Sequence, residues 1–175
     1  MDRYLQQARA ILDEAISGMS DEQLAAARNG KWSVAQILEH LSLAFGATTA
    51  GMERTAVAEK LEVRAPSVRD RVATLLVTRF GYIPTGRKAP AYTMPAGIAP
   101  TEAIRKLREN LAEMDAAITR AEQKWGDRRI AVNPAIGPLK ADQWRKFHFL
   151  HARHHARQIV AIKAASQQTT AHAAA

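Results

Sequence analysis

The chain has 175 residues, of which 47% are hydrophobic and 24% are charged; these values are typical of one folded domain with an ordinary core rather than of a disordered chain. It contains no cysteine, which excludes disulfides, thiolate metal ligands and a cysteine nucleophile, so any metal must be held by imidazole or oxygen. Lys and Arg number 25 against 17 Asp and Glu, a formal net charge of +8, which is compatible with anionic partners.

The N-terminal residues, MDRYLQQARAILDEAI, are charged and amphipathic and lack the apolar core of a signal peptide. No apolar run approaches the roughly 18 residues needed to cross a bilayer. We therefore expect a cytoplasmic protein without a membrane partner.

Helical periodicity dominates the first third of the chain. Apolar residues at spacings of three and four predict a helix over residues 5–19. A capping-box pattern then predicts a short helical turn over 20–27, and Asn29-Gly30 breaks the chain. Ser33 is the expected N-cap of a second long helix that continues to about Lys60.

The middle connection combines a short helix with a long loop. Pro66-Ser67 predicts a helix over about 68–79, with Val72, Leu75 and Leu76 directed inward. Residues 81–100 contain three Gly and four Pro, which predicts a loop long enough to form a lid or a pocket wall. The segment from Arg64 to Lys88 has six basic residues and one acid; it could attract an anionic substrate or nucleic acid, or be solvated surface charge.

The C-terminal part continues the helical pattern. Thr101 is the expected N-cap of a third long helix that ends before Gly126. Residues 127–139 are expected to form a loop, and a last helix is predicted over about 141–164.

We find no convincing strand pattern, internal repeat or interior domain boundary. Four long amphipathic helices predict an all-α fold, a four-helix bundle with an additional short helix in the middle connection. The bundle is expected to be a single domain over residues 1–165, followed by a flexible C-terminal tail over 166–175.

Four of the six histidines fall within residues 148–155 of the last helix. Side chains three and four residues apart share one face of a helix, and His154 is turned by about 100° from His155. One inward row therefore has imidazoles in its middle: Trp144, His148, His151, His155, Gln158 and Ile162.

The second helix carries one histidine on a comparable row. His40 is followed on that row by the small residues Ala44, Ala47 and Gly51, which could leave space for a ligand. Imidazoles that meet from two facing rows indicate one divalent metal ion, and neutral imidazole suits Zn, Ni and Fe alike. The alternative is a histidine-rich helix surface, which would require a rotated last helix.

Two motifs resemble those of a known family. Residues 32–41 (WSVAQILEHL) and 151–159 (HARHHARQI) are similar to the two signatures of the DinB-like (YfiT-like) superfamily. The resemblance implies a four-helix bundle, often dimeric, with a His₃ metal site, and by position the metal ligands would be His40, His151 and His155. Some relatives are metal-dependent transferases or isomerases that use a low-molecular-weight thiol.

The first functional hypothesis is a metal-dependent thiol S-transferase that acts on a small-molecule substrate, because metal coordination favours the thiolate. His148 would lie behind the ligands or shuttle protons, unless it is a packed core histidine. Cofactor-binding candidates are Arg153, Arg157 and Gln158, although surface charge also accounts for the two arginines.

Two other functions stay open. A metal-dependent hydrolase needs a general base beside metal-bound water, and the nearest carboxylate in sequence, Glu39, points about 100° away from His40. A non-catalytic metal-binding or stress-response module is the third hypothesis. No specific nucleic acid is expected, since basic residues are not interleaved with aromatic ones.

Overall fold

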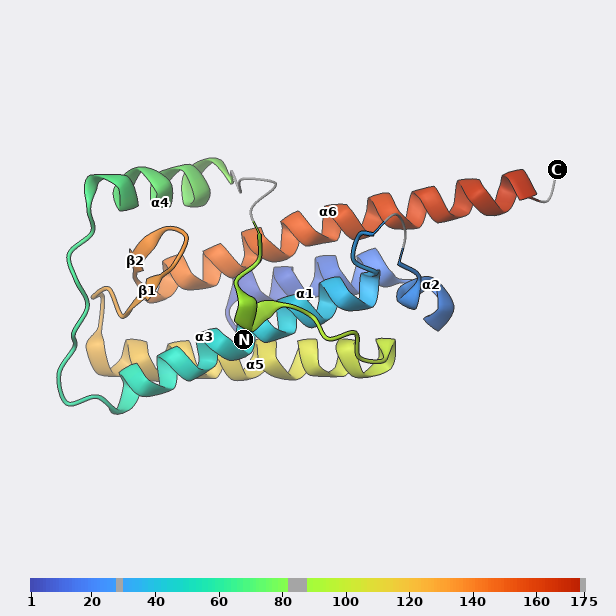
Figure 1. Cartoon of the computed structure of the whole chain (residues 1–175). Coiled ribbons are helices and arrows are strands. Elements are labelled where there is room, and N and C mark those ends of the chain that lie inside the picture. The colour runs from blue at the N-terminus through green and yellow to red at the C-terminus, as the bar shows by residue number, and fades with distance from the viewer. Residues whose placement is uncertain (28–29, 82–87, 174–175) are drawn as a thin grey trace.

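The four long helices form a bundle, as the sequence predicts. The computed structural model describes residues 1–27, 30–81 and 88–173, with side chains to Ser166. The long helices are α1 (Arg3–Ile16), α3 (Val34–Val57), α5 (Pro100–Trp125) and α6 (Ala141–Ala173). In Figure 1 they lie along one another, with α3 packed on α5 and α1 packed on α6.

Local signals in the sequence explain where the first helices begin. Ser33 and Gln36 form a capping box at the start of α3, with hydrogen bonds of 3.2 and 2.9 Å, and this satisfies backbone N–H groups that a helix start leaves free. The same device begins the predicted short helix, α2 (Asp21–Ala25). The sequence also predicts a break at Asn29-Gly30, and residue 29 lies outside the part of the chain that the structure describes.

The helix in the middle connection, α4 (Val68–Phe80), faces the bundle with a different side from the one predicted. It lies apart from α3 and α5, over α6 and a small hairpin (Figure 1). Val77 is its buried residue, at 4% exposure, whereas Val72, Leu75 and Leu76 are 51, 54 and 40% exposed. The inward assignment of those three was wrong, because α4 has apolar residues on both of its faces and its own periodicity does not say which is covered.

Several helix boundaries differ from the predictions. The first long helix ends at Ile16 and not near Met19. The second long helix ends at Val57 and not near Lys60. The third begins at Pro100, and Thr101 is its second residue and not its cap, because proline already suits the first helical position. The last helix continues to Ala173; residues 174–175 of the predicted tail and the side chains of 167–175 lie outside the described part.

The predicted loop over residues 127–139 contains a two-stranded antiparallel hairpin, β1 (Ala131–Asn133) and β2 (Gly137–Leu139). The Asn133 carboxamide accepts the backbone N–H groups of Ala135 and Ile136 and so closes the turn. Gly137 has a φ of 86°, in the region that favours glycine. Strands of three residues are too short to give a periodic signal, which is why the sequence indicated only a loop.

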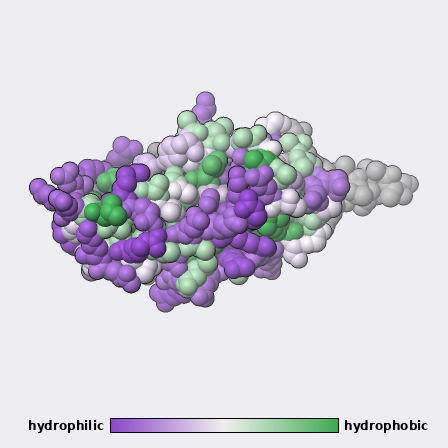
Figure 2. Space-filling model, turned by 90° about the horizontal axis from the view of Figure 1, so that it is seen from below, coloured by the Kyte–Doolittle hydropathy of each residue, from purple (hydrophilic) through white to green (hydrophobic). Residues whose placement is uncertain are grey.

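The surface seen from below the bundle, in Figure 2, is mostly hydrophilic with scattered hydrophobic side chains. This fits amphipathic helices whose apolar stripes are turned into a common core. Within residues 1–27, 30–81 and 88–173, no helix has both the length and the apolar character to cross a bilayer.

Candidate metal centre

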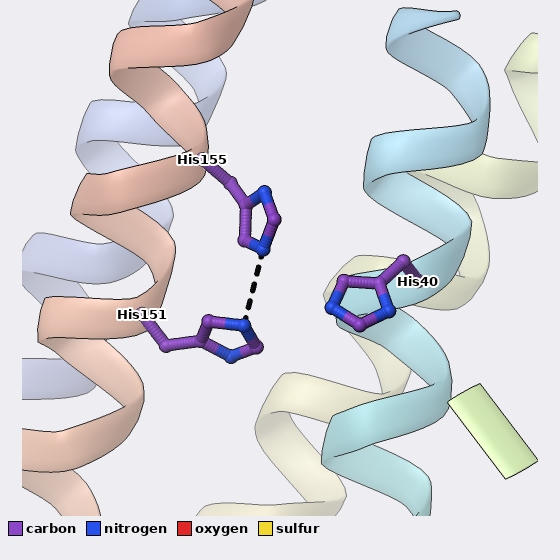
Figure 3. Close-up of side chains that lie close together, drawn as sticks. All are labelled: His40, His151 and His155. Atoms are coloured by element: carbon purple, nitrogen blue, oxygen red, sulfur yellow. Dashed lines mark hydrogen bonds between the residues drawn. The ribbon is translucent and has the colours of Figure 1, made fainter. Parts of the chain in front are cut away.

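Three histidines from two helices converge inside the bundle. His40 comes from the middle of α3, and His151 and His155 come from successive turns of α6; Figure 3 shows their rings directed toward one another. One ring nitrogen from each lies within 4.8 Å of the other two. The Nε2 atoms of His151 and His155 are 3.1 Å apart.

This spacing is close to that of a coordination sphere. Two nitrogens bound to one tetrahedral ion at 2.0–2.1 Å stand about 3.3 Å apart. The pair from α6 already has nearly this separation, and the longest of the three separations, 4.8 Å, must shorten by roughly 1.5 Å to complete the site. The three residues could therefore hold one metal ion.

For His40 and His155, a hydrogen bond to a neighbouring residue determines which ring nitrogen is free to bind a metal. His40 Nδ1 is 2.8 Å from the carbonyl oxygen of Thr93, which can only accept, so Nδ1 carries the proton. His155 Nδ1 is 2.8 Å from the Gln158 carboxamide oxygen and donates to it in the same way. Both rings then present the lone pair of Nε2 to the site, as metal-binding histidines commonly do.

Either a proton on His151 or a metal ion must lie between the two histidines of α6. Because His155 Nδ1 donates to Gln158, its Nε2 offers a lone pair to His151 Nε2 at 3.1 Å. If His151 also presents a lone pair there, the two repel each other unless a positive charge lies between them. The donor set of this centre thus fits a metal ion.

Burial keeps these imidazoles neutral. Desolvation, with a smaller contribution from nearby His40, lowers the pKa of His155 to about 4. Desolvation also lowers the pKa of His40 and takes that of His151 well below the ordinary value, with the neighbouring imidazoles adding to the effect on His151. At neutral pH all three are free bases, the form that coordinates a metal.

His148 lies next to the ligands without joining them. It is 2% exposed, its ring stacks on that of Trp144 at 5.9 Å, and its Nε2 is 3.0 Å from the Thr48 hydroxyl. Burial lowers its pKa to about 3, so it stays neutral at physiological pH. A charged proton carrier at this position would be costly.

Glu39 holds a backbone segment beside the site, a role that the sequence did not predict. Its carboxylate is 5% exposed and accepts three backbone N–H groups, from Ala96, Gly97 and Ile98, at 2.9, 2.8 and 3.2 Å. This fixes the segment after the short 3₁₀ helix η1 (Ala91–Thr93), whose last residue supplies the carbonyl oxygen for His40.

A signal for Glu39 exists in the sequence. Ala35 and Ser42, four residues before and three after it, are also buried, at 3% each. Small residues at these spacings mark a second inward row on α3, beside that of His40.

Of the other predicted site residues, one lies at the metal centre and two do not. Gln158 is brought to the centre as the partner of His155. The Arg153 guanidinium lies over the Phe149 ring at 5.6 Å and beside Gly81, at the end of α4. Arg157 is exposed one turn further on, so neither arginine is brought to the three histidines.

The small residues after His40 do not enclose a space. Ala44 and Gly51 are half-buried and Ala47 is exposed, so this row turns from the core to the surface along α3. Any room for a substrate would therefore open toward solvent.

Comparison with known proteins supports the family resemblance. The family model that describes the DinB superfamily matches residues 4–159, a range that includes all three histidines, the whole of α3 and α5, and the larger part of α1 and α6. No curated protein and no solved structure matches the chain.

Proposed function

The chain belongs to the DinB superfamily, and from that premise we propose that it binds one divalent metal ion through His40, His151 and His155 and uses it to activate a low-molecular-weight thiol for transfer to a small electrophile. The observation that carries the proposal is the convergence of three neutral imidazoles from two helices, of which His40 and His155 are buried and His151 is half-buried. No cysteine or carboxylate takes part in this set.

The charge of the ligand set favours an anionic sulfur. A divalent ion in such a site stabilises a thiolate relative to its thiol near neutral pH. Three neutral protein ligands cancel none of the positive charge, and they leave coordination positions for a small ligand. The role of the chain is to hold the ligands in place, His40 through Thr93 and His155 through Gln158.

Hydrolysis is less well supported because it needs a general base near the site. Glu39 is adjacent to His40 in sequence, but both of its oxygens accept backbone N–H groups of residues 96–98. A carboxylate engaged in this way is poorly placed to take a proton from water. Thiol activation does not require such a base.

Arg153 and Arg157 stay candidates for binding the carboxylates of a thiol cofactor. Both lie on a side of α6 away from the ligands, so only a cofactor of several residues' length would reach them. Their role is tested separately by measuring the thiol affinity of variants in which each arginine is replaced by an uncharged residue.

The first experiment measures metal content. Protein purified without a histidine tag is expected to contain about one divalent ion per chain, and His155→Ala is expected to lose it. His172→Ala, in the C-terminal segment, controls for the removal of a histidine as such. Equal metal content in wild type and His155→Ala would overturn the site.

The second experiment tests the thiol. We expect the Co²⁺-loaded protein to develop a thiolate-to-cobalt charge-transfer absorption when reduced glutathione is added, and its oxidised form to give none. A cobalt spectrum that does not respond to glutathione or to a simpler alkyl thiol would leave metal binding standing and overturn thiol activation.

A further inference from the structure

Three buried nitrogen atoms on one face of α6 have no hydrogen-bond partner among the residues that the structure describes: Trp144 Nε1, His148 Nδ1 and His151 Nδ1. Trp144 and His148 are 5 and 2% exposed. The three residues follow at spacings of four and three, so their side chains share one face. Buried polar groups are nearly always hydrogen-bonded, and such a group commonly marks a bound water or ligand.

The tautomer of His148 follows from its other nitrogen. The Thr48 hydroxyl donates its proton to the carbonyl oxygen of Ala44, one turn back, at 3.0 Å. The same hydroxyl oxygen can then only accept from His148 Nε2, also at 3.0 Å. His148 therefore carries its proton on Nε2 and presents a lone pair on Nδ1.

His151 has the opposite arrangement when it serves as a ligand. Its Nε2 faces the other two histidines and must offer a lone pair to the metal. The proton then lies on Nδ1, which makes this atom a donor. The indole N–H of Trp144 is also a donor, so the three unpartnered atoms comprise two donors and one acceptor.

Aromatic rings shield this face from bulk solvent. Phe147 packs edge-on against His148, at 5.2 Å between ring centroids, and stacks on His151 at 5.8 Å. Phe45 from α3 also packs edge-on against His148, at 5.3 Å between ring centroids. We therefore expect a molecule that binds the three nitrogens to exchange slowly with bulk solvent.

We propose that a water molecule bound at this face accepts the Nδ1–H of His151 and donates to Nδ1 of His148, with the indole N–H of Trp144 as a further donor to it. His148 is then a positioning residue for the metal ligand His151. The chain of hydrogen bonds continues from His148 through Thr48 to the backbone of α3. This inference rests on the proposed metal site.

The arrangement gives each metal ligand an outer partner of its own. His40 donates to Thr93 and His155 to Gln158, and the water supplies the corresponding acceptor for His151. Outer partners of this kind fix the orientation and tautomer of a ligand and raise its basicity. His148, which lies outside the family's motifs, thereby acquires a role.

Two substitutions at one position separate this role from simple packing. His148→Asn keeps an acceptor near the position of Nδ1 and loses the bond to Thr48. His148→Gln keeps a donor near the position of Nε2, which can reach Thr48, and loses the acceptor. If His148 serves only to pack or to bind Thr48, the His148→Gln variant should retain the higher metal affinity. If it binds the proposed water, His148→Asn should retain the higher metal affinity.

The measurement is the Zn²⁺ dissociation constant, determined by competition with a chelator for wild type and both variants. We expect His148→Gln to weaken Zn²⁺ binding by about 10–100-fold, the loss typical of removing an outer partner, while His148→Asn stays close to wild type. Equal affinities in the two variants, or weaker binding by Asn than by Gln, would overturn the inference and leave the metal site intact. Absence of Zn²⁺ binding by the wild type would overturn both.

NMR spectroscopy of the Zn²⁺-loaded protein without substrate tests the water directly. The indole N–H of Trp144 is expected to show a cross-peak to a long-lived water, and His148 to be protonated on Nε2. Trp125, whose indole N–H donates to the Thr55 carbonyl oxygen at 2.8 Å, is the internal control and should show none. A His148 proton on Nδ1, or no water contact at Trp144, would contradict the proposal.

Discussion

The Nε2 atoms of His151 and His155 face each other across 3.1 Å on successive turns of α6. The Nδ1–H of His155 is engaged by Gln158, so its Nε2 has only a lone pair to offer. A proton on His151 or a metal ion can occupy the space between them, and the two exclude each other. Metal binding at this centre therefore requires the His151 tautomer that carries its proton on Nδ1.

Zn²⁺ is expected to stabilise the folded protein without being required for folding, because a bundle of 175 residues should fold on its hydrophobic core alone. At a free concentration one hundred times the dissociation constant, the free energy of unfolding should rise by about 2.7 kcal/mol. This corresponds to roughly 5–10 °C in Tm for a chain of this length. Thermal denaturation followed by circular dichroism measures the shift; it should vanish with a chelator and in His155→Ala, and an equal shift in that variant would place the metal elsewhere.

The metal-free protein is expected to lose stability in mild acid. Burial lowers the pKa of His155 to about 4 and that of His148 to about 3, below the value of about 6.5 in an unfolded chain. Between these limits the unfolded state binds more protons, so stability is complete above pH 6.5 and declines as the pH falls toward 4 and 3.

Urea denaturation of the metal-free protein at pH 7.5, 5.5 and 4.5 tests this dependence. His148→Phe removes one of the two groups, so the free energy of unfolding should depend less steeply on pH in this variant. A wild-type stability that is constant down to pH 4.5 would contradict the burial of neutral imidazoles. A slope that is unchanged in His148→Phe would assign the effect to other groups.

Glu39 is expected to control both the segment after η1 and the ligand His40. Glu39→Ala leaves three backbone N–H groups, of Ala96, Gly97 and Ile98, without their acceptor, which should cost about 2–4 kcal/mol in the free energy of unfolding. Hydrogen exchange at these three amides should accelerate. Glu59→Ala, at an exposed position beyond the end of α3, is the matched control and should change stability by less than about 0.5 kcal/mol.

Gln158 offers a way to strengthen the metal site. It accepts the Nδ1–H of His155 at 2.8 Å, and a carboxylate in the same place accepts more strongly and makes the ligand more basic. Gln158→Glu should therefore tighten Zn²⁺ binding, and Gln158→Ala should weaken it by about tenfold or more. Chelator competition measures the Zn²⁺ affinity of wild type and of both variants. Tighter binding by Gln158→Ala than by Gln158→Glu would show that residue 158 does not act as the hydrogen-bond partner of His155.

The sequence predicted those parts of the fold and site that depend on one helix at a time. Spacings of three and four place His151 and His155 on one face of α6, and the N-cap and family motif place His40 inward on α3. Contacts between distant segments were not predictable: Glu39 meets the N–H groups of residues 96–98 only because the connection folds back on α3. Hairpin strands of three residues, closed by Asn133, are likewise too short to give a pattern.

The apolar pattern of α4 is compatible with burial of either of two faces of the helix, and substitutions can test which face is buried. Leu75 is 54% exposed and Val77 is 4% exposed, although periodicity alone assigned Leu75 to the core. Val77→Ala should lower the free energy of unfolding by about 1–3 kcal/mol, because it leaves a cavity among packed side chains. Leu75→Ala removes a larger side chain and should still cost less than about 0.5 kcal/mol, since most of that side chain is already in water. Urea denaturation of the two variants decides between the orientations: a larger loss for Leu75→Ala would mean that α4 covers the bundle with the face that the sequence pattern indicated.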